Sequence, residues 1–239
     1  MRRAESGDEG AGATHSERLE RMRRPADYPL TILAINPLNR CLVRPLHRLG
    51  VSPNAITWLS FFLAALAALS IWYGIREAPW WRWLMVPGLV FVSHMCDALD
   101  GDLARYSGRS SLFGAALDPT LDRAREALYV GAVACGVGSL DSWRWGLACL
   151  GGALVYYYTV DVQGSRILQA GVHELKRHVA TAGEVRGTRV KLGLYEPFMY
   201  GLTLLAVAGW GVGALTFFTV AFWVAWVGQL VKLSRAASS

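Results

Sequence analysis

Residues 54–74 read NAITWLSFFLAALAALSIWYG, and this apolar stretch decides the fold class. An α-helix of this length is long enough to cross about 30 Å of hydrocarbon. Ser52 and Pro53 directly before it form a helix-start signal, an N-cap followed by proline at the first helical position. The stretch therefore predicts a transmembrane helix that begins close to residue 53.

Further apolar segments follow at residues 83–99, 112–137, 143–163, 195–211 and 213–231. Each has the length of about seventeen or more residues that a membrane span needs. The connections between them are short, except for residues 164–194. We expect an all-α integral membrane protein with six transmembrane helices.

The residues before the first span divide into two parts. Residues 1–27 carry six Arg and six acidic residues and show no apolar periodicity, so we expect a disordered polar tail. Residues 28–51 form an amphipathic juxtamembrane segment, in which leucines and arginines recur on opposite faces: Leu38, Leu42, Leu46 and Leu49 against Arg40, Arg44 and Arg48. This pattern is typical of a helix in the lipid headgroup region, although a soluble helix packed on a core has the same pattern, and Pro45 predicts a kink in either. Residues 52–239 then form a six-helix catalytic domain.

The distribution of Lys and Arg predicts the orientation in the membrane. With a cytoplasmic N-terminus, six spans return the C-terminus to the cytoplasm, and the exterior connections carry only Arg76, Arg82 and Arg144 of 24 basic residues. Basic residues favour the cytoplasmic side. Five tryptophans gather at the exterior boundary, as in an interfacial aromatic belt: Trp80, Trp81, Trp83, Trp143 and Trp145. We expect both termini and the active site on the cytoplasmic side of a bacterial inner membrane.

The composition excludes several classes of protein. Of 239 residues, 53% are hydrophobic and 18% are charged, and the mean hydropathy is +0.28, which excludes a disordered or collagen-like chain. The four cysteines form no CxxC pair and lie in apolar surroundings: Cys41, Cys96, Cys135 and Cys149. We expect them to be small buried residues, not a disulfide framework or a zinc site.

Five carboxylates fall within 26 residues of this apolar chain: Asp97, Asp100, Asp102, Asp118 and Asp122. Ionised groups at membrane depth are costly, so they are functional candidates. Asp97 and Asp100 lie one helical turn apart near the end of the second span, and Asp118 and Asp122 lie one turn apart near the start of the third. Two antiparallel helices joined at residues 107–111 bring both pairs face to face. Four such carboxylates repel one another without cations between them, and oxygen-only ligation favours Mg²⁺, Mn²⁺ or Ca²⁺ over zinc.

The residues between the two pairs favour a ligand that bears phosphate. Gly101 and Ala104 lie on one helix face and let a ligand approach the backbone. Arg105 offers a planar fork of donors for a phosphate group. A hard cation held by few carboxylates usually completes its shell with phosphate oxygens. Metal, phosphate and a hydroxyl acceptor together indicate phosphoryl transfer.

The pattern Asp97-x2-Asp100-Gly101-x2-Ala104-Arg105-x8-Gly114-x3-Asp118-x3-Asp122 resembles, without a mismatch, the signature of the CDP-alcohol phosphotransferase family. Residues 52–57, SPNAIT, are similar to the opening of the first span in that family. Six spans after a juxtamembrane helix also agree with it. After residue 130 we identify no subfamily pattern.

The resemblance implies a role for each matching residue. Two divalent ions, Mg²⁺ or Mn²⁺, are expected on Asp97, Asp100, Asp118 and Asp122, and Asp122 is also expected to act as general base on the acceptor hydroxyl. Residues facing the nucleotide or phosphates of the CDP donor are expected to be Asn54, Thr57, Gly101, Ala104, Arg105, Ser111 and Gly114. The resemblance also implies a homodimer.

Two interpretations stay open for the basic segment at residues 164–194. Some of its basic residues bind a phosphate on the acceptor, for which the candidates are Arg166, Arg186, Arg189 and Lys191. Alternatively, the segment reflects the ordinary cytoplasmic bias of basic residues and attraction to anionic lipid.

Several other polar residues near the pattern also have two interpretations. Asp102 lies outside the signature and is expected to be solvated or paired. Arg123, Arg125 and Glu126 either neutralise the acidic site or pair with one another. Glu196, before Pro197, is either a helix start or a wall of the pocket.

The function favoured by the sequence is transfer of a phosphatidyl group from a CDP-linked donor, CDP-diacylglycerol, to a small polar alcohol, with release of CMP, in phospholipid biosynthesis. The alternative is transfer from a soluble CDP-alcohol to a lipid or polyol-phosphate acceptor. We expect membrane lipid and no nucleic acid among the partners. An aromatic prenyltransferase also pairs Asp clusters with Mg²⁺, but its clusters lie on distant helices. An ion transporter is a non-enzymatic alternative, which would place its acids near mid-membrane in repeated halves.

Overall fold

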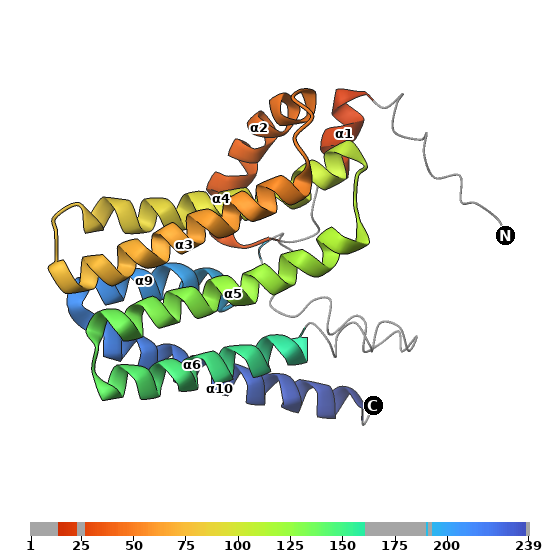
Figure 1. Cartoon of the computed structure of the whole chain (residues 1–239). Coiled ribbons are helices and arrows are strands. Elements are labelled where there is room, and N and C mark those ends of the chain that lie inside the picture. The colour runs from red at the N-terminus through yellow and green to blue at the C-terminus, as the bar shows by residue number, and fades with distance from the viewer. Residues whose placement is uncertain (1–13, 23–26, 161–189, 191–192, 238–239) are drawn as a thin grey trace.

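The computed structural model describes residues 14–22, 27–160, 190 and 193–237. Four long helices follow one another along the chain: α3 (Pro53–Glu77), α4 (Arg82–Ser107), α5 (Leu112–Val137) and α6 (Leu140–Tyr158). They run side by side, and their short connections alternate between the two ends of a bundle (Figure 1). Within the described residues the regular elements are helices, so the all-α prediction is confirmed.

The last apolar region folds as a helical hairpin. Its first arm comprises the π-helical turn η3 (Pro197–Gly201), α9 (Leu202–Leu205) and a second π-helical turn, η4 (Ala206–Trp210). Gly209 has a φ of 93°, which glycine adopts readily, and it breaks the helical path before α10 (Gly211–Ala237). The Phe198 ring contacts Phe218 and Phe222 across this reversal, with centroid distances of 5.4 and 5.0 Å. Over the residues that the structure describes, each of the six predicted apolar segments therefore overlaps a helical stretch.

In the described part of the chain, two helical regions, Pro53–Glu77 and Pro197–Lys232, are long and apolar enough to cross a membrane, and the second comprises the last two of these stretches. The second of them includes the reversal at Gly209. Helices α4 and α5 have 26 residues each but carry the acidic pattern, which lowers their apolar character. The core between the helices is built partly from small side chains such as Ala64, Ala67 and Ala153, which let helix backbones approach closely.

Helix α1 (His15–Arg21) lies within the segment predicted to be a disordered tail. Its N-terminus is closed by a capping box, in which the Thr14 hydroxyl accepts from the Glu17 amide and the Glu17 carboxylate accepts from the Thr14 amide. Met22 follows it and is buried in a cluster with Val43 and Tyr106. The predicted disorder therefore does not extend to residues 14–22, because a local cap and one buried side chain stabilise them.

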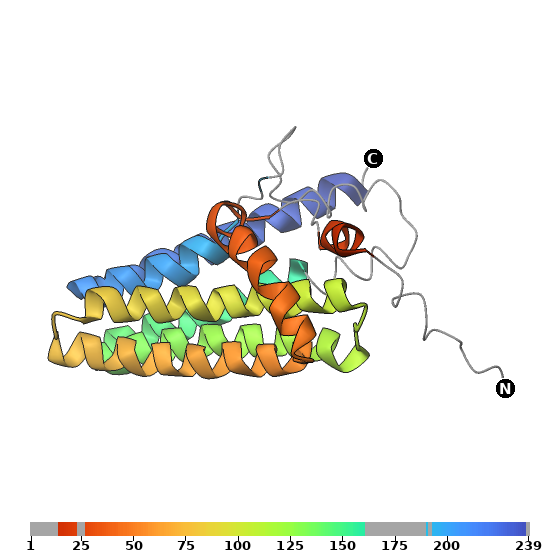
Figure 2. The same cartoon turned by 90° about the horizontal axis from the view of Figure 1, so that it is seen from above.

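Helix α2 (Asn36–Arg48) has the predicted amphipathic form, with Pro45 inside it, and follows the π-helical turn η1 (Thr31–Ile35). Asn39 and Val43 are buried against the bundle, whereas Leu38 and Leu42 stay exposed. Helices α1 and α2 lie at the end of the bundle where α4 joins α5 (Figures 1 and 2), and the C-terminal end of α10 lies at that same end.

The prediction that all four cysteines are buried is correct for Cys96 and Cys149 and wrong for Cys41 and Cys135. Cys41 lies on the outer side of α2, and Cys135 lines an apolar groove between α3 and α5. All four thiols are free.

Candidate active site

The acidic residues are positioned by the hairpin between α4 and α5. Helix α4 ends at Gly108, whose φ of 66° is left-handed, and α5 begins after Ser111, whose hydroxyl accepts from the Gly114 amide at 2.9 Å. This tight connection matches the predicted turn at residues 107–111. The two helices then run antiparallel, with the acidic residues of each close to the turn.

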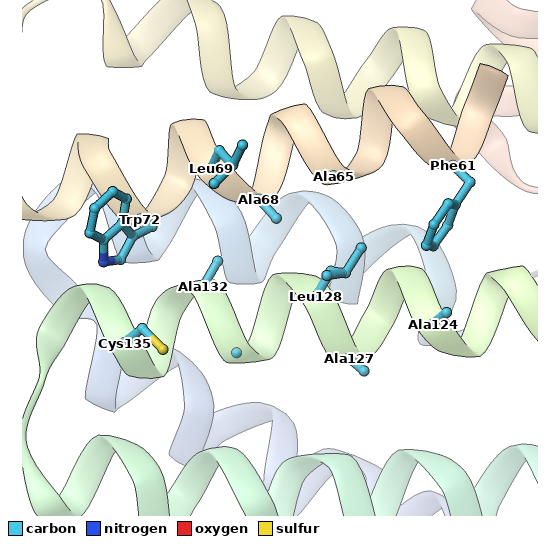
Figure 3. Close-up of a pocket in the computed structure, with 11 residues that line it drawn as sticks. Phe61, Ala65, Ala68, Leu69, Trp72, Ala124, Ala127, Leu128, Ala132 and Cys135 are labelled. Carbon is cyan, nitrogen blue, oxygen red and sulfur yellow. The ribbon is translucent and has the colours of Figure 1, made fainter. Parts of the chain in front are cut away.

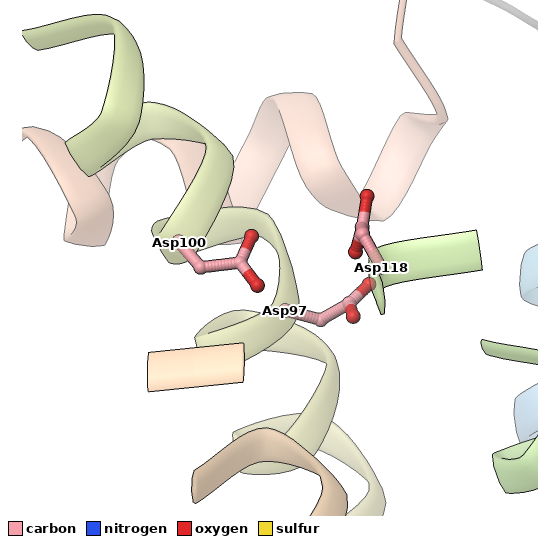
Figure 4. Close-up of side chains that lie close together, drawn as sticks. All are labelled: Asp97, Asp100 and Asp118. Carbon is pink, nitrogen blue, oxygen red and sulfur yellow. The ribbon is translucent and has the colours of Figure 1, made fainter. Parts of the chain in front are cut away.

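Three carboxylates converge across this hairpin. Asp97 and Asp100 extend from α4 toward Asp118 of α5 (Figure 4), and each offers an oxygen within 4.8 Å of the others. Asp122 lies one turn further along α5 and lines the same pocket, outside this three-residue cluster. The structure thus brings together the four acids that the sequence pattern selects.

The pocket around these acids has a volume of about 580 Å³. It is lined by Asp27, Tyr28, Thr31, His94, Asp97, Ala98, Asp100, Gly101, Arg105, Asp118, Pro119, Asp122, Arg123, Tyr157 and Tyr195. Sequence reasoning did not identify Tyr28, Thr31, Tyr157 or Tyr195. These side chains come from three distant parts of the chain, and no local pattern around any of them indicates a site.

A buried arginine links the acids of the two helices. Arg125 is 1% exposed, and its guanidinium contacts Asp97 and lies 3.3 Å from Asp122. It also donates to the Ser60 hydroxyl at 3.2 Å and to the Tyr195 hydroxyl at 3.1 Å. Of the two interpretations left open by the sequence, Arg125 therefore neutralises the acidic site.

Arg123 and Glu126 follow the other interpretation, because they pair with each other. Arg123 donates to Glu126 at 2.9 Å, and its guanidinium lies over the Tyr157 ring, 3.6 Å from the centroid. Arg123 nevertheless also lines the pocket, so its positive charge faces the same space as the acids.

Asp102 is paired and buried. Its carboxylate accepts from Arg105 at 2.6 Å and from the Asn39 side chain of α2 at 3.0 Å. Arg105 lines the pocket, so Asp102 connects the amphipathic helix to the residue expected to bind phosphate. Of the two predicted states, solvated or paired, the structure has the paired one.

The residues expected to face the donor occupy different places. Gly101 and Arg105 line the pocket, whereas Thr57 does not, and its hydroxyl donates to the Pro53 carbonyl at 3.2 Å. A Cβ on Gly114 would lie 2.9 Å from the Asn54 side-chain oxygen, so a larger residue there would require the Asn54 side chain to move. Ala104 and Ser111 are described but do not line the pocket, and Ser111 acts as the N-cap of α5. The acceptor candidates Arg166, Arg186, Arg189 and Lys191 lie outside the described residues.

The donor set fits a hard divalent cation. It consists of carboxylate oxygens from two helices, and one oxygen of Asp100 is buried without a hydrogen-bond partner in the described part of the chain. A buried, unpaired carboxylate oxygen is costly unless a cation or donor satisfies it. The chemistry of these ligands suits Mg²⁺ or Mn²⁺.

A second pocket, of about 840 Å³, is apolar. It lies between α3 and α5 (Figure 3), where Phe61 and Trp72 of α3 extend toward the side of α5 that carries Ala124 and Ala132. Its lining contains no ionisable carboxylate or base, so it offers nothing for diphosphate chemistry. The acidic pocket is therefore the candidate active site.

Comparisons with known proteins identify the family of the chain. Residues 50–233 match the sequence profile of the CDP-alcohol phosphatidyltransferases, and this range includes the whole acidic pattern. The chain is 31% identical over 212 residues to a phosphatidylinositol phosphate synthase from Cutibacterium acnes, covering 86% of this chain and 94% of the relative. It is 29% identical over 182 residues to an archaetidylinositol phosphate synthase from Pyrococcus horikoshii, covering 73% and 85%.

The fold also has a solved counterpart. The crystal structure of Mycobacterium tuberculosis phosphatidylinositol phosphate synthase with CDP-DAG bound superposes with a TM-score of 0.59 and 19% identity. The match covers 81% of this chain and 92% of that one. The chain belongs to the CDP-alcohol phosphatidyltransferase family and is a membrane-associated transferase of phospholipid biosynthesis.

Proposed function

We propose that this enzyme transfers the phosphatidyl group of CDP-diacylglycerol to the hydroxyl of a small polyol phosphate and releases CMP. The observation that carries the proposal is the convergence of Asp97, Asp100 and Asp118 beside Asp122 in one pocket. The class of acceptor is supported by two relatives that are named as synthases of inositol phosphate lipids. The donor is supported by the solved neighbour that holds CDP-DAG.

In this proposal the acids divide the chemical work. Asp97, Asp100 and Asp118, together with Asp122, would hold two divalent ions. Such ions would supply positive charge to offset that of the donor diphosphate and of the leaving CMP. Arg105, kept in place by Asp102, donates to a phosphate of the donor. Gly101 leaves room for the donor at the surface of α4, and Asn54 and Thr57 of α3 are proposed to contact the donor.

Asp122 acts as the general base. The acceptor oxygen attacks the phosphorus that bears the diacylglycerol group, the bond from that phosphorus to the oxygen of CMP breaks, and CMP leaves with the bonding electrons. Asp122 takes the proton of the attacking hydroxyl, and Arg125 at 3.3 Å holds its carboxylate in place. Arg166, Arg186, Arg189 and Lys191 are proposed to bind the phosphate of the acceptor.

We further propose that the helical stretches form six spans with both termini in the cytoplasm. The positions of α1 and of the end of α10 at one end of the bundle support this arrangement. The acidic pocket then opens at the cytoplasmic side of the membrane, where soluble acceptors are available. We propose a homodimer as the functional unit, which chemical cross-linking in membranes tests directly.

The experiment that tests the function measures CMP release by the purified protein with Mg²⁺ or Mn²⁺. CDP-diacylglycerol is supplied with inositol phosphate, inositol, glycerol phosphate or serine, one acceptor at a time. We expect release with inositol phosphate and at least about tenfold less with inositol, because a pocket built to pair with a phosphate discriminates against its loss. Release only with a soluble CDP-alcohol and a lipid acceptor would favour the alternative donor class.

A further inference from the structure

Glu196 joins two segments that are distant in the sequence. It is 7% exposed and lies directly before η3. One carboxylate oxygen accepts from the Thr31 amide and the Thr31 hydroxyl, both at 2.9 Å, and the other accepts from the Leu30 amide at 3.0 Å. The amides at the start of a helix have no partner within the helix, so a carboxylate there forms strong, charge-assisted bonds.

The segment fastened by Glu196 forms one wall of the acidic pocket. Tyr28 and Thr31 both line the pocket, and the Tyr28 ring lies 5.7 Å from the ring of Tyr195, the residue next to Glu196. The Tyr195 hydroxyl accepts from Arg125, which also contacts Asp122. A continuous set of contacts therefore runs from the fastened segment to the Asp122 side of the pocket.

We propose that Glu196 is a positioning residue for the acceptor, which it serves by holding Tyr28 and Thr31 as the wall on the Asp122 side. The inference rests on the proposed function, in which Asp122 takes the proton of the acceptor hydroxyl. The residues that line the Asp122 side of the pocket therefore face the acceptor. Gly101 and Arg105 line the side of the pocket that faces the donor. Loss of the three bonds frees the wall and lowers acceptor affinity, while donor affinity is retained.

The kinetic test compares Glu196→Gln and Thr31→Val with a matched control, Thr203→Val. Thr203 is as buried as Thr31, but its hydroxyl bonds the Met199 carbonyl of the same helical stretch at 2.9 Å. We expect Glu196→Gln and Thr31→Val to raise the acceptor KM about tenfold, the scale of a charge-assisted hydrogen bond, with the KM for CDP-diacylglycerol within about twofold. Thr31→Ser, which keeps the hydroxyl, should restore the acceptor KM, and Thr203→Val should leave both KM values unchanged.

An unchanged acceptor KM, or equal increases in both KM values, would overturn the proposal and leave Glu196 a purely structural cap. The contact itself is tested without any substrate by amide hydrogen exchange at Leu30 and Thr31 in Glu196→Gln, which should become faster. Exchange at the wild-type rate would also overturn the proposal. Absence of CMP release by the wild-type protein would count against the proposed function alone.

Discussion

At the scale of single residues, Asp102 is the acidic side chain whose role follows from its contacts and not from the family signature. It accepts from Arg105 at 2.6 Å and from Asn39 at 3.0 Å. Asp102→Asn removes the charge that orients Arg105 and keeps the size of the side chain. We expect the KM for the CDP donor to rise about tenfold, since hydrogen bonds to charged groups contribute about 1.5–3 kcal/mol. Asp141→Asn, which breaks an exposed pair at the other end of the bundle, is the control and should leave this KM unchanged.

Arg125 should be required for stability as well as activity. Its guanidinium is buried between Asp97 and Asp122, and removing one member of a buried pair leaves an uncompensated charge. We expect Arg125→Met to lower the free energy of unfolding by about 3–5 kcal/mol, measured by thermal unfolding in detergent without added metal. A melting temperature equal to that of the wild type would show that the acids do not need this counter-charge.

The convergence of the acidic residues could be predicted because it depends on local spacing in the sequence. The contacts that surround them could not, because they join distant parts of the chain. Asp97 and Asp100 share a helix face by the geometry of one turn, and a short connection places Asp118 opposite them. Thr31 meets Glu196 across 165 positions of the sequence, and only the three-dimensional fold reveals that contact. The pairing of Asp102 with Asn39 is non-local for the same reason.

At the scale of elements, a contact between Arg18 of α1 and His47 of α2 helps to hold α1 on the bundle. Arg18 donates to His47 of α2 at 2.8 Å, and Tyr106 of α4 contacts the His47 ring edge to face at 5.4 Å. Partial burial, Arg18 and then Arg109 lower the pKa of His47 below its ordinary value of 6.5. The neutral imidazole accepts the bond, and the protonated ring cannot.

The contribution of this contact to α1 docking is therefore fully present above about pH 6.5 and is lost as the pH falls through the lowered pKa. We expect amide exchange over residues 15–21, corrected for its intrinsic pH dependence, to accelerate between pH 7.5 and pH 5. In His47→Gln, which keeps an acceptor that does not titrate, the acceleration should be absent. An equal acceleration in both proteins would remove His47 from the explanation.

Element prediction succeeded where the apolar periodicity was long and failed where a short element was stabilised by one cap. The long segment at residues 54–74 lies within α3, because an uninterrupted apolar run of that length has few alternatives to a helix. The segment at residues 112–137 coincides with α5, although charged residues interrupt its apolar pattern. Helix α1 has only seven residues, and its polar composition masked the capping box at Thr14 and Glu17.

At the scale of the whole molecule, the orientation in the membrane is tested by the native cysteines. Cys41 is exposed on α2, on the side proposed to be cytoplasmic, whereas Cys96 and Cys149 are buried. We expect a membrane-impermeant maleimide to label Cys41 in inverted vesicles and not in intact cells, and Cys41→Ser to abolish that label. Labelling of Cys41 from outside the cell would reverse the proposed topology.

The sequence allowed the all-α class, the positions of the long helices in the described residues and the convergence of the acidic residues to be predicted, since each depends on local composition or spacing. The packing of Leu30 and Thr31 against Glu196 could not be predicted, because it joins segments 165 and 166 positions apart in the sequence. That packing completes the pocket, so the fold contributes a wall that the acidic signature does not contain.

The most direct test of the account is CMP release from CDP-diacylglycerol by the wild-type protein and by Asp122→Asn, with donor binding measured separately. The variant keeps the shape of the side chain but cannot accept the proton of the acceptor, so release should fall by about 10²-fold or more. Its affinity for the donor should stay within about threefold of the wild-type value. A variant that releases CMP at the wild-type rate, or a wild-type protein that releases none from any CDP-linked donor, would contradict the account.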